Sequence, residues 1–131
     1  MAAQLHLQIV SPAQSVMDAA VDMVEIPGLE GDFGVLPGHS PFFSMLRPGI
    51  ITVTQGATKT RLFATTGYAE VSPEGVIVLS DSIQDLSSIS REQAQEALEE
   101  AERDLSHAED ANDKAKAEKK VDAAKALVAI L

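Results

Sequence analysis

The sequence contains no cysteine and no tryptophan, and it has a single tyrosine among its 131 residues. The absence of cysteine excludes disulfides, thiol nucleophiles and thiolate metal ligands. Aromatic residues make up only 4% of the chain, whereas proteins that bind nucleic acid by stacking bases usually carry more. The net charge of −10 also opposes binding to a phosphate backbone. We therefore expect no nucleic-acid partner, and a basic protein surface is the better match.

Long apolar runs are missing as well. The uninterrupted apolar stretches are a few residues long, whereas a membrane-spanning helix needs about 20. Residues Met1 to Gln4 show neither the charged nor the apolar region of a signal peptide. We expect no direct insertion into a membrane, so any membrane association would depend on an embedded partner. The 45% hydrophobic fraction is enough to bury a core in one domain, or in one domain with an appendage.

Glycine and proline stop abruptly along the chain. All eight glycines and all six prolines precede residue 88, and the remainder is rich in Ala, Glu, Gln, Lys, Asp and Leu. Glycine and proline mark turns, whereas the second composition favours helices. We predict a β-sandwich domain over residues 1–87 and a helical hairpin over residues 88–131.

Short β-branched and alternating runs fill the first segment. Leu5, Leu7 and Ile9 alternate with polar residues, the period of a half-buried strand. Further strands are expected over 21–26, 49–54, 61–66, 68–71 and 76–79, separated by Gly/Pro turns. Because no helical pattern interrupts these runs, they favour a sandwich or a barrel.

The second segment begins with a helix signal. Ser90 and Gln93 have the spacing of a capping box, and apolar residues recur at helical spacing from Ala94 to Ala108. A second helix, capped by Asp110 or Asn112, is expected to continue to Leu131. The first helix is acidic and the second carries five lysines, so charge pairing within the hairpin, with the other charged faces in water, is the expected arrangement. Its contact stripe is mostly alanine, which predicts weak packing.

The Gly/Pro-rich stretch from Gly28 to Pro41 is the densest candidate site. It has four glycines within eleven residues but no lysine and two carboxylates, which excludes a phosphate-binding loop. Asp32, His39 and Ser40 are the residue types of a hydrolase triad, yet no nucleophile elbow surrounds Ser40. The three histidines are scattered, so no metal site and no catalytic set is predicted. Two interpretations remain: a rigid turn with Leu29, Phe33 or Leu36 filling the core, or an exposed docking loop.

One family resemblance covers the whole chain. The stretch from Val21 to Gly49 closely resembles the epsilon subunit of the F-type ATP synthase, as do Leu7 to Pro12, Gly67 to Val71 and the helical hairpin. The most specific run is Gly31-Asp32-Phe33-Gly34-Val35-Leu36-Pro37-Gly38-His39-Ser40-Pro41. The resemblance implies a ten-stranded β-sandwich followed by an antiparallel two-helix hairpin, in a rotor subunit without an active site of its own.

The resemblance also implies partners. In the family the sandwich binds the gamma subunit and rests on the ring of membrane c-subunits, whose loops carry arginine. The positions that match its ring-docking loop are Gly28, Glu30, Gly31, Asp32, Gly34, Pro37, Gly38 and His39. The hairpin of the family can extend into the catalytic head of alpha and beta subunits and inhibit ATP hydrolysis, or lie folded on the sandwich. The expected location is the cytoplasmic side of a bacterial inner membrane, as a peripheral subunit.

A nucleotide motif of the family is degenerate in this chain. In some members an aspartate and an arginine at the start of the hairpin help to bind ATP. Here the corresponding run includes Ile89, Ser90, Gln93 and Ala94, so Ser90 replaces the aspartate and Gln93 the arginine. Two further arginine positions read Glu100 and Asp104. Carboxylates repel a triphosphate, so we expect weak or absent ATP binding and no cofactor.

Two other functions stay open on the residues alone. A small hydrolase using His39 would turn over a substrate as the purified chain. A β-sandwich adaptor of another assembly would share the fold but would not bind gamma. Copurification with gamma distinguishes the adaptor from the ATP synthase subunit.

Overall fold

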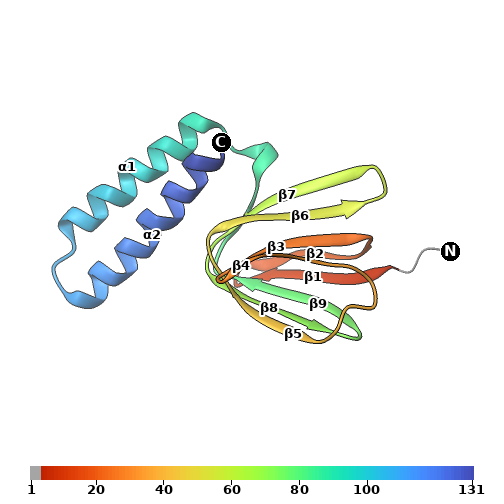
Figure 1. Cartoon of the computed structure of the whole chain (residues 1–131). Coiled ribbons are helices and arrows are strands. Elements are labelled where there is room, and N and C mark those ends of the chain that lie inside the picture. Colours follow the sequence, from red (N-terminus) through yellow and green to blue (C-terminus); the bar gives the residue numbers. More distant parts are fainter. Residues whose placement is uncertain (1–3) are drawn as a thin grey trace. The chain divides into compact units, whose positions relative to one another are not determined.

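The computed structural model describes residues 4–131 and divides the chain into two compact units, Met1–Leu86 and Ser87–Leu131. The first unit is all β and the second is helical (Figure 1). The strands are β1 (Leu5–Ser11), β2 (Gln14–Val21), β3 (Met23–Gly28), β4 (Gly31–Val35), β5 (Phe42–Leu46), β6 (Gly49–Gln55), β7 (Thr58–Ala64), β8 (Gly67–Ser72), β9 (Gly75–Ser80) and β10 (Ile83–Asp85). After a 3₁₀ turn at Leu86–Ser88, the helices are α1 (Arg91–His107) and α2 (Ala111–Ile130).

The ten strands form one sheet in the order β10-β7-β6-β3-β5-β8-β9-β1-β2, with β4 paired to β3. All pairs are antiparallel except β1 with β9. The sheet folds over itself, so that β3, β6 and β7 lie in one layer and β5, β8 and β9 in the other (Figure 1). The predicted ten-stranded sandwich followed by two helices is confirmed.

Alternating side chains of both layers build the core. Leu7, Ile9, Ile26, Ile51 and Val78 are almost fully buried. Since fully burying a Val, Leu or Ile side chain stabilises a fold by about 1.5–3 kcal/mol, this cluster stabilises the sandwich, and the strands present alternate residues outward.

Strand β3 joins the two layers. Its first residues pair with β6, from Met23↔Thr54 to Glu25↔Thr52, and its last residue, Gly28, pairs with Leu46 of β5. The Arg47 N–H donates to the Pro27 carbonyl at 3.1 Å, and the Leu29 N–H donates to the Met45 carbonyl at 2.8 Å. One strand therefore leaves one layer and enters the other at its C-terminal end.

Four strands lie outside the ranges that the sequence patterns predicted: β2, β4, β5 and β10. The glycine-rich β4 carries turn-like residues and forms because the whole of it pairs with β3, from Gly28↔Gly31 to Val24↔Val35. Strand β10 has only three residues, which pair with β7. Tertiary pairing therefore overrides local propensity at these strands.

Both helices begin at the predicted caps. Ser90 Oγ accepts the Gln93 N–H at 3.1 Å, and the Gln93 side chain accepts the Ser90 N–H at 3.0 Å. Asp110 caps α2 by accepting the Asp113 N–H at 2.7 Å. Three of the five buried helix residues are alanines, which agrees with the predicted alanine-rich contact stripe. The five are Ala94 and Ala101 of α1, and Ala117, Val121 and Leu127 of α2. Neither helix in the described part of the chain is long and apolar enough to cross a membrane.

Candidate functional site

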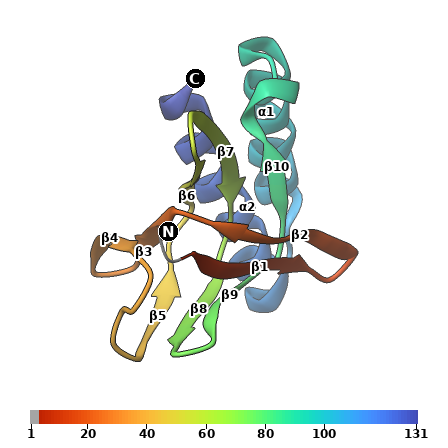
Figure 2. The same ribbon diagram turned by 90° about the vertical axis from the view of Figure 1, so that its right-hand side faces the viewer.

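The stretch from Gly28 to Pro41 is mostly a β-hairpin rather than a loop. Strands β3 and β4 meet at a two-residue turn, Leu29-Glu30, and a second turn follows β4 from residue 36 to residue 41. Figure 2 shows β3 and β4 at one margin of the sandwich. A strand rises about 3.3 Å per residue, so the five residues of β4 place the two turns roughly 15 Å apart. Glu30 and His39, expected in one docking loop, lie in different turns.

Glycine is required at the Leu29-Glu30 turn. A Cβ on Gly28 would lie 2.6 Å from the Gly31 carbonyl oxygen, too close for any side chain. Gly31 has a φ of 145°, a conformation that L-residues rarely adopt. The turn therefore projects Leu29 and Glu30 from a tight backbone, and Leu29 is 63% exposed.

Asp32, beside this turn, forms an ion pair inside the chain. The Arg47 guanidinium donates from Nη2 to Asp32 Oδ1 and from Nη1 to the Gly28 carbonyl. The Asp32 side chain is 70% exposed and Arg47 is 41% exposed, so a partner can still reach both. Glu30 forms no ion pair with any residue of 4–131, which leaves it as the uncompensated acid of the turn.

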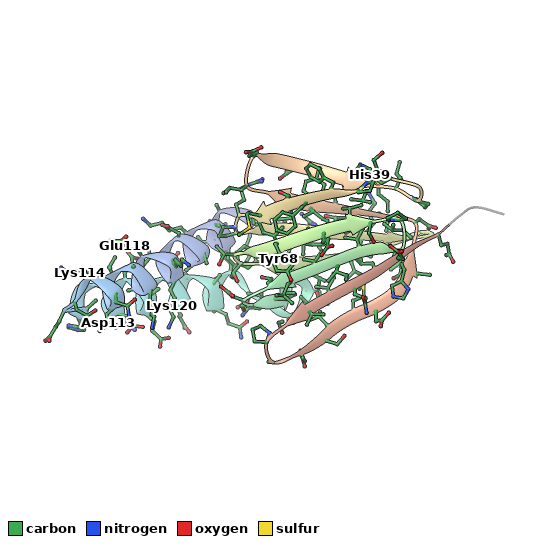
Figure 3. The ribbon with its side chains drawn as sticks, turned by 90° about the horizontal axis from the view of Figure 1, so that it is seen from below. His39, Tyr68, Asp113, Lys114, Glu118 and Lys120 are labelled. Carbon is green, nitrogen blue, oxygen red and sulfur yellow. The ribbon has the colours of Figure 1, made fainter. Side chains whose placement is uncertain are left out.

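His39 lies in the second turn, between β4 and β5 (Figure 3). Its backbone N–H donates to the Leu36 carbonyl at 3.2 Å, and its Nδ1 lies 2.7 Å from the Ser40 carbonyl oxygen. Gly38 has a φ of 83°, which explains the glycine after Pro37. Among the described residues, neither the Asp32 carboxylate nor the Ser40 hydroxyl forms a hydrogen bond with the His39 ring, so a triad is not assembled.

Of the three residues named as candidates to fill the core, Phe33 is the one that does so. Phe33 packs against the core and meets Phe42 edge-on, with ring centroids 5.1 Å apart. Leu29 and Leu36 are instead exposed, by 63% and 55%. Val35 is the fully buried residue because it shares the inward face of β4 with Phe33. Both exposed leucines therefore lie in the turns, where a partner could bury them.

An apolar surface covers the outer side of β5, β8 and β9. The strand register aligns Met45, Tyr68 and Leu79 in one row, and Phe43 with Ile77 across Glu70 in the next. Phe43 is 57% exposed and stacks on Tyr68, with the two ring centroids 5.5 Å apart. Figure 3 looks onto this side of the sandwich, where Tyr68 is labelled. We call this set the outer apolar face: Phe43, Met45, Tyr68, Ile77 and Leu79.

The residues predicted to form a degenerate nucleotide motif lie at the cap of α1. Ser90 and Gln93 satisfy each other's backbone N–H groups, and Ala94 is buried. Ile89, the other motif residue, is partly buried. The polar side chains that replace the family's aspartate and arginine are thus already engaged in the capping box.

The expected charge pairing between the helices is absent from the described part of the chain. No lysine of α2 forms an ion pair with a carboxylate of α1. Along one flank of the hairpin, Asp104 and His107 of α1 line a groove with Asp113, Lys116 and Lys120 of α2. The α2 charges Asp113, Lys114, Glu118 and Lys120 are labelled in Figure 3. The charge-pairing prediction was wrong because the alanine seam, not the charges, sets the contact between the helices.

Sequence reasoning missed Arg47 and the outer apolar face. Arg47 is one of only three lysine or arginine residues before residue 88, with Lys59 and Arg61. A rare cation close in sequence to an acidic loop could have suggested an ion pair with that loop. The outer apolar face had no local signal, because Phe43 and Met45 belong to a strand that was not predicted. Only the register of β5 with β8 and of β8 with β9 brings its members together.

Known proteins match this architecture. Residues 4–85 match the family model described as ATP synthase, Delta/Epsilon chain, beta-sandwich domain. The ATP synthase epsilon chain of Maricaulis maris is 41% identical over 129 residues, covering 98% of this chain and 92% of its own length. That of Afipia carboxidovorans is 40% identical over 120 residues, covering 92% and 88%.

Solved structures are similar over nearly the whole chain. A chain of the Euglena gracilis mitochondrial ATP synthase, solved by cryo-EM with OSCP, F1 and the c-ring, has a TM-score of 0.79 and 27% identity, covering 98% of this chain and 81% of its own. A chain of the Tetrahymena thermophila central stalk and c-ring structure shares the fold, with a TM-score of 0.71 at 9% identity and 98% and 97% coverage. The chain belongs to the epsilon chain family of ATP synthase.

Proposed function

We propose that the chain is a non-catalytic subunit of the ATP synthase rotor, which couples rotation of the c-ring to ATP synthesis by binding both gamma and the ring. The outer apolar face carries this proposal, because a lone β-sandwich does not need such a surface in water. The location that follows is peripheral, at the cytoplasmic side of a bacterial inner membrane, and the relatives from bacteria support it.

Gamma is the partner proposed for the outer apolar face. Its exposed Phe43, Met45, Ile77 and Leu79, with exposures from 37% to 57%, leave on the order of 350 Å² of apolar surface. A patch of that size matches the largest patch of a typical monomer, which often marks a binding site. Glu70 lies between Phe43 and Ile77, so the matching surface of gamma would be apolar with a basic residue opposite Glu70.

The two turns of the β3–β4–β5 region are the proposed c-ring contacts. Glu30 supplies an uncompensated carboxylate beside exposed Leu29, and the second turn supplies Leu36 and His39. Exposed ion pairs contribute about 0–1 kcal/mol each, so the contacts would set the register on basic ring loops rather than supply most of the affinity. Because the turns lie at opposite ends of β4, they would meet different parts of the ring.

The hairpin is the proposed regulatory element. Its α2 lysines are not paired with α1 and could meet acidic surfaces of the alpha and beta subunits, which would inhibit ATP hydrolysis. We propose that ATP binds weakly or not at all. Ser90 and Gln93 are engaged in the cap, and Glu100 and Asp104 present carboxylates where the family's arginines would be.

Copurification of the full chain with gamma tests the proposed function. Replacing Phe43 or Met45 by Glu should weaken gamma binding by roughly 30-fold or more, equivalent to about 2 kcal/mol, because a carboxylate would be buried at the interface. Leu36→Glu is the matched control: it changes an equally exposed leucine outside the outer apolar face and should bind gamma as the original chain does. Normal gamma binding by Phe43→Glu and Met45→Glu would refute the assignment.

A further inference from the structure

The Leu29-Glu30 turn depends on one side chain from another strand. Arg47 follows β5, 19 residues after Gly28 and 15 after Asp32, and it contacts both sides of the turn. Its Nη1 donates to the Gly28 carbonyl on β3, and its Nη2 donates to Asp32 Oδ1 on β4. A planar guanidinium can hold two acceptors at once in a fixed geometry, which an ammonium group cannot reproduce.

Two backbone hydrogen bonds place Arg47 for this role. The Leu29 N–H donates to the Met45 carbonyl at 2.8 Å, and the Arg47 N–H donates to the Pro27 carbonyl at 3.1 Å. These bonds hold β3 beside β5 directly behind the turn. Gly28 also pairs with Leu46 of β5, and the Arg47 side chain adds the contacts that reach the turn from β5 through a side chain.

The same contacts divide the charge of the turn. Asp32 Oδ1 is neutralised by Arg47, whereas Oδ2 accepts no hydrogen bond within the described residues. Glu30 has no cationic partner in residues 4–131. The turn therefore presents one free carboxylate at a defined position, with the Asp32 carboxylate held still beside it.

We propose that Arg47 is a positioning residue for partner binding: it fixes the Leu29-Glu30 turn and orients Asp32, so that Glu30 meets a basic loop of the ring in one geometry. This inference rests on the proposed function, since it names the residue that prepares the ring contact. Arg47 does not itself supply the attraction, because its positive charge would oppose a basic partner.

The first test is local and needs no partner. Amide hydrogen exchange of the full chain should be at least tenfold faster at Leu29 in Arg47→Gln, while the amide of Ile51 in the core stays unchanged. Arg61→Gln is the matched control, since Arg61 is exposed on β7 and forms no ion pair within residues 4–131. Arg47→Lys keeps the positive charge but loses the guanidinium that holds two acceptors at once, so it should give an intermediate exchange rate at Leu29. If Arg47→Gln does not fold, Arg47→Lys decides by the same criterion.

The second test uses the assembled ATP synthase in membrane vesicles. The ratio of ATP-driven proton pumping to ATP hydrolysis should fall at least twofold in Arg47→Gln, whereas the affinity for gamma stays within twofold of the original. Arg47→Lys should restore part of the ratio, and Arg61→Gln should leave it unchanged. Glu30→Gln should lower the ratio without changing exchange at Leu29, because it removes the charge and not its support.

Three outcomes overturn the inference or separate it from the proposed function. Unchanged exchange at Leu29 in Arg47→Gln would show that Arg47 does not hold the turn. Faster exchange at Leu29 in Arg47→Gln with an unchanged ratio of proton pumping to ATP hydrolysis would show that Arg47 stabilises the turn but has no role in partner binding. Failure of the original chain to bind gamma would refute the proposed function, while the exchange result would still decide what Arg47 does in the turn.

Discussion

Gly67 is the position where the packing of the sandwich leaves least room. A Cβ on Gly67 would lie 1.9 Å from the Leu79 carbonyl oxygen and 2.8 Å from the Leu79 carbonyl carbon and from Ser80 Cα. All three neighbours are backbone atoms of β9, so no side-chain rotation can relieve the clash. Gly67→Ala must therefore separate β8 from β9 at the pair Gly67↔Ser80.

That separation would disturb a buried hydrogen-bond cluster. Ser80 is 2% exposed, its hydroxyl accepts the Thr65 N–H at 3.1 Å, and it lies 3.0 Å from the Ser82 carbonyl oxygen. Overpacking usually costs about 1–3 kcal/mol, and a buried polar group left without partners costs about 1–3 kcal/mol more. We expect Gly67→Ala to lower the free energy of unfolding by about 3–5 kcal/mol, a large part of what a domain of this size usually has.

The single tyrosine makes the measurement specific. Tyr68 is the only tyrosine, there is no tryptophan, and Tyr68 lies in the sandwich, so its fluorescence during urea unfolding reports that unit alone. Gly56→Ala is the control: Gly56 requires glycine for a different reason, a φ of 59°, and nothing lies within 4 Å of its Cβ position. It should lose only about 1–2 kcal/mol. Equal losses in the two variants would refute the expected cost of the β8–β9 clash at Gly67.

Further predictions concern the hairpin and the polar cluster. Ser90→Ala removes the cap of α1 and should destabilise the hairpin by about 1 kcal/mol in a thermal melt followed by circular dichroism; an unchanged melt would contradict the cap's contribution. Ser80→Ala should lower the free energy of unfolding by about 1–3 kcal/mol, measured by Tyr68 fluorescence, and no loss would mean that water replaces the hydroxyl. Calorimetric titration of the full chain with ATP should show no binding, and micromolar affinity would refute the loss of the nucleotide site. Truncation after Ser88 should leave gamma binding and coupling largely intact, and a chain that no longer copurifies with gamma would assign that interface to the hairpin.

The parts of the fold that were predictable are those coded by neighbouring residues. The capping box of Ser90 and Gln93 and the cap at Asp110 are local, so both helix starts followed from spacing. The alternation of Leu5, Leu7 and Ile9 likewise identified β1. A strand can be predicted without knowledge of its tertiary contacts when its side chains alternate clearly or when turn residues mark its ends.

The rest depends on residues far apart in sequence. Strand β4 consists of Gly31-Asp32-Phe33-Gly34-Val35, which has turn-like composition and becomes a strand only against β3. The Arg47–Asp32 pair requires β3, β4 and β5 to meet at one corner, and the outer apolar face requires the register of three strands. The docking residues were therefore expected in one loop, although the structure divides them among the end of β3, strand β4 and the turns on either side of β4.

The continuity of β3 has a mechanical consequence. The turn at Leu29-Glu30 and the strand carrying Phe43 and Met45 are joined by backbone hydrogen bonds that run from β3 to β5, perpendicular to the strand axes. A force along the strand axes would load these bonds together with the two Arg47 contacts, so several bonds would have to break at once. Such shear loading makes a joint stiff, whereas peeling from one end would break the same bonds one after another. Under the proposed function, the corner at Gly28 would transmit torque between gamma and the ring with little elastic twist.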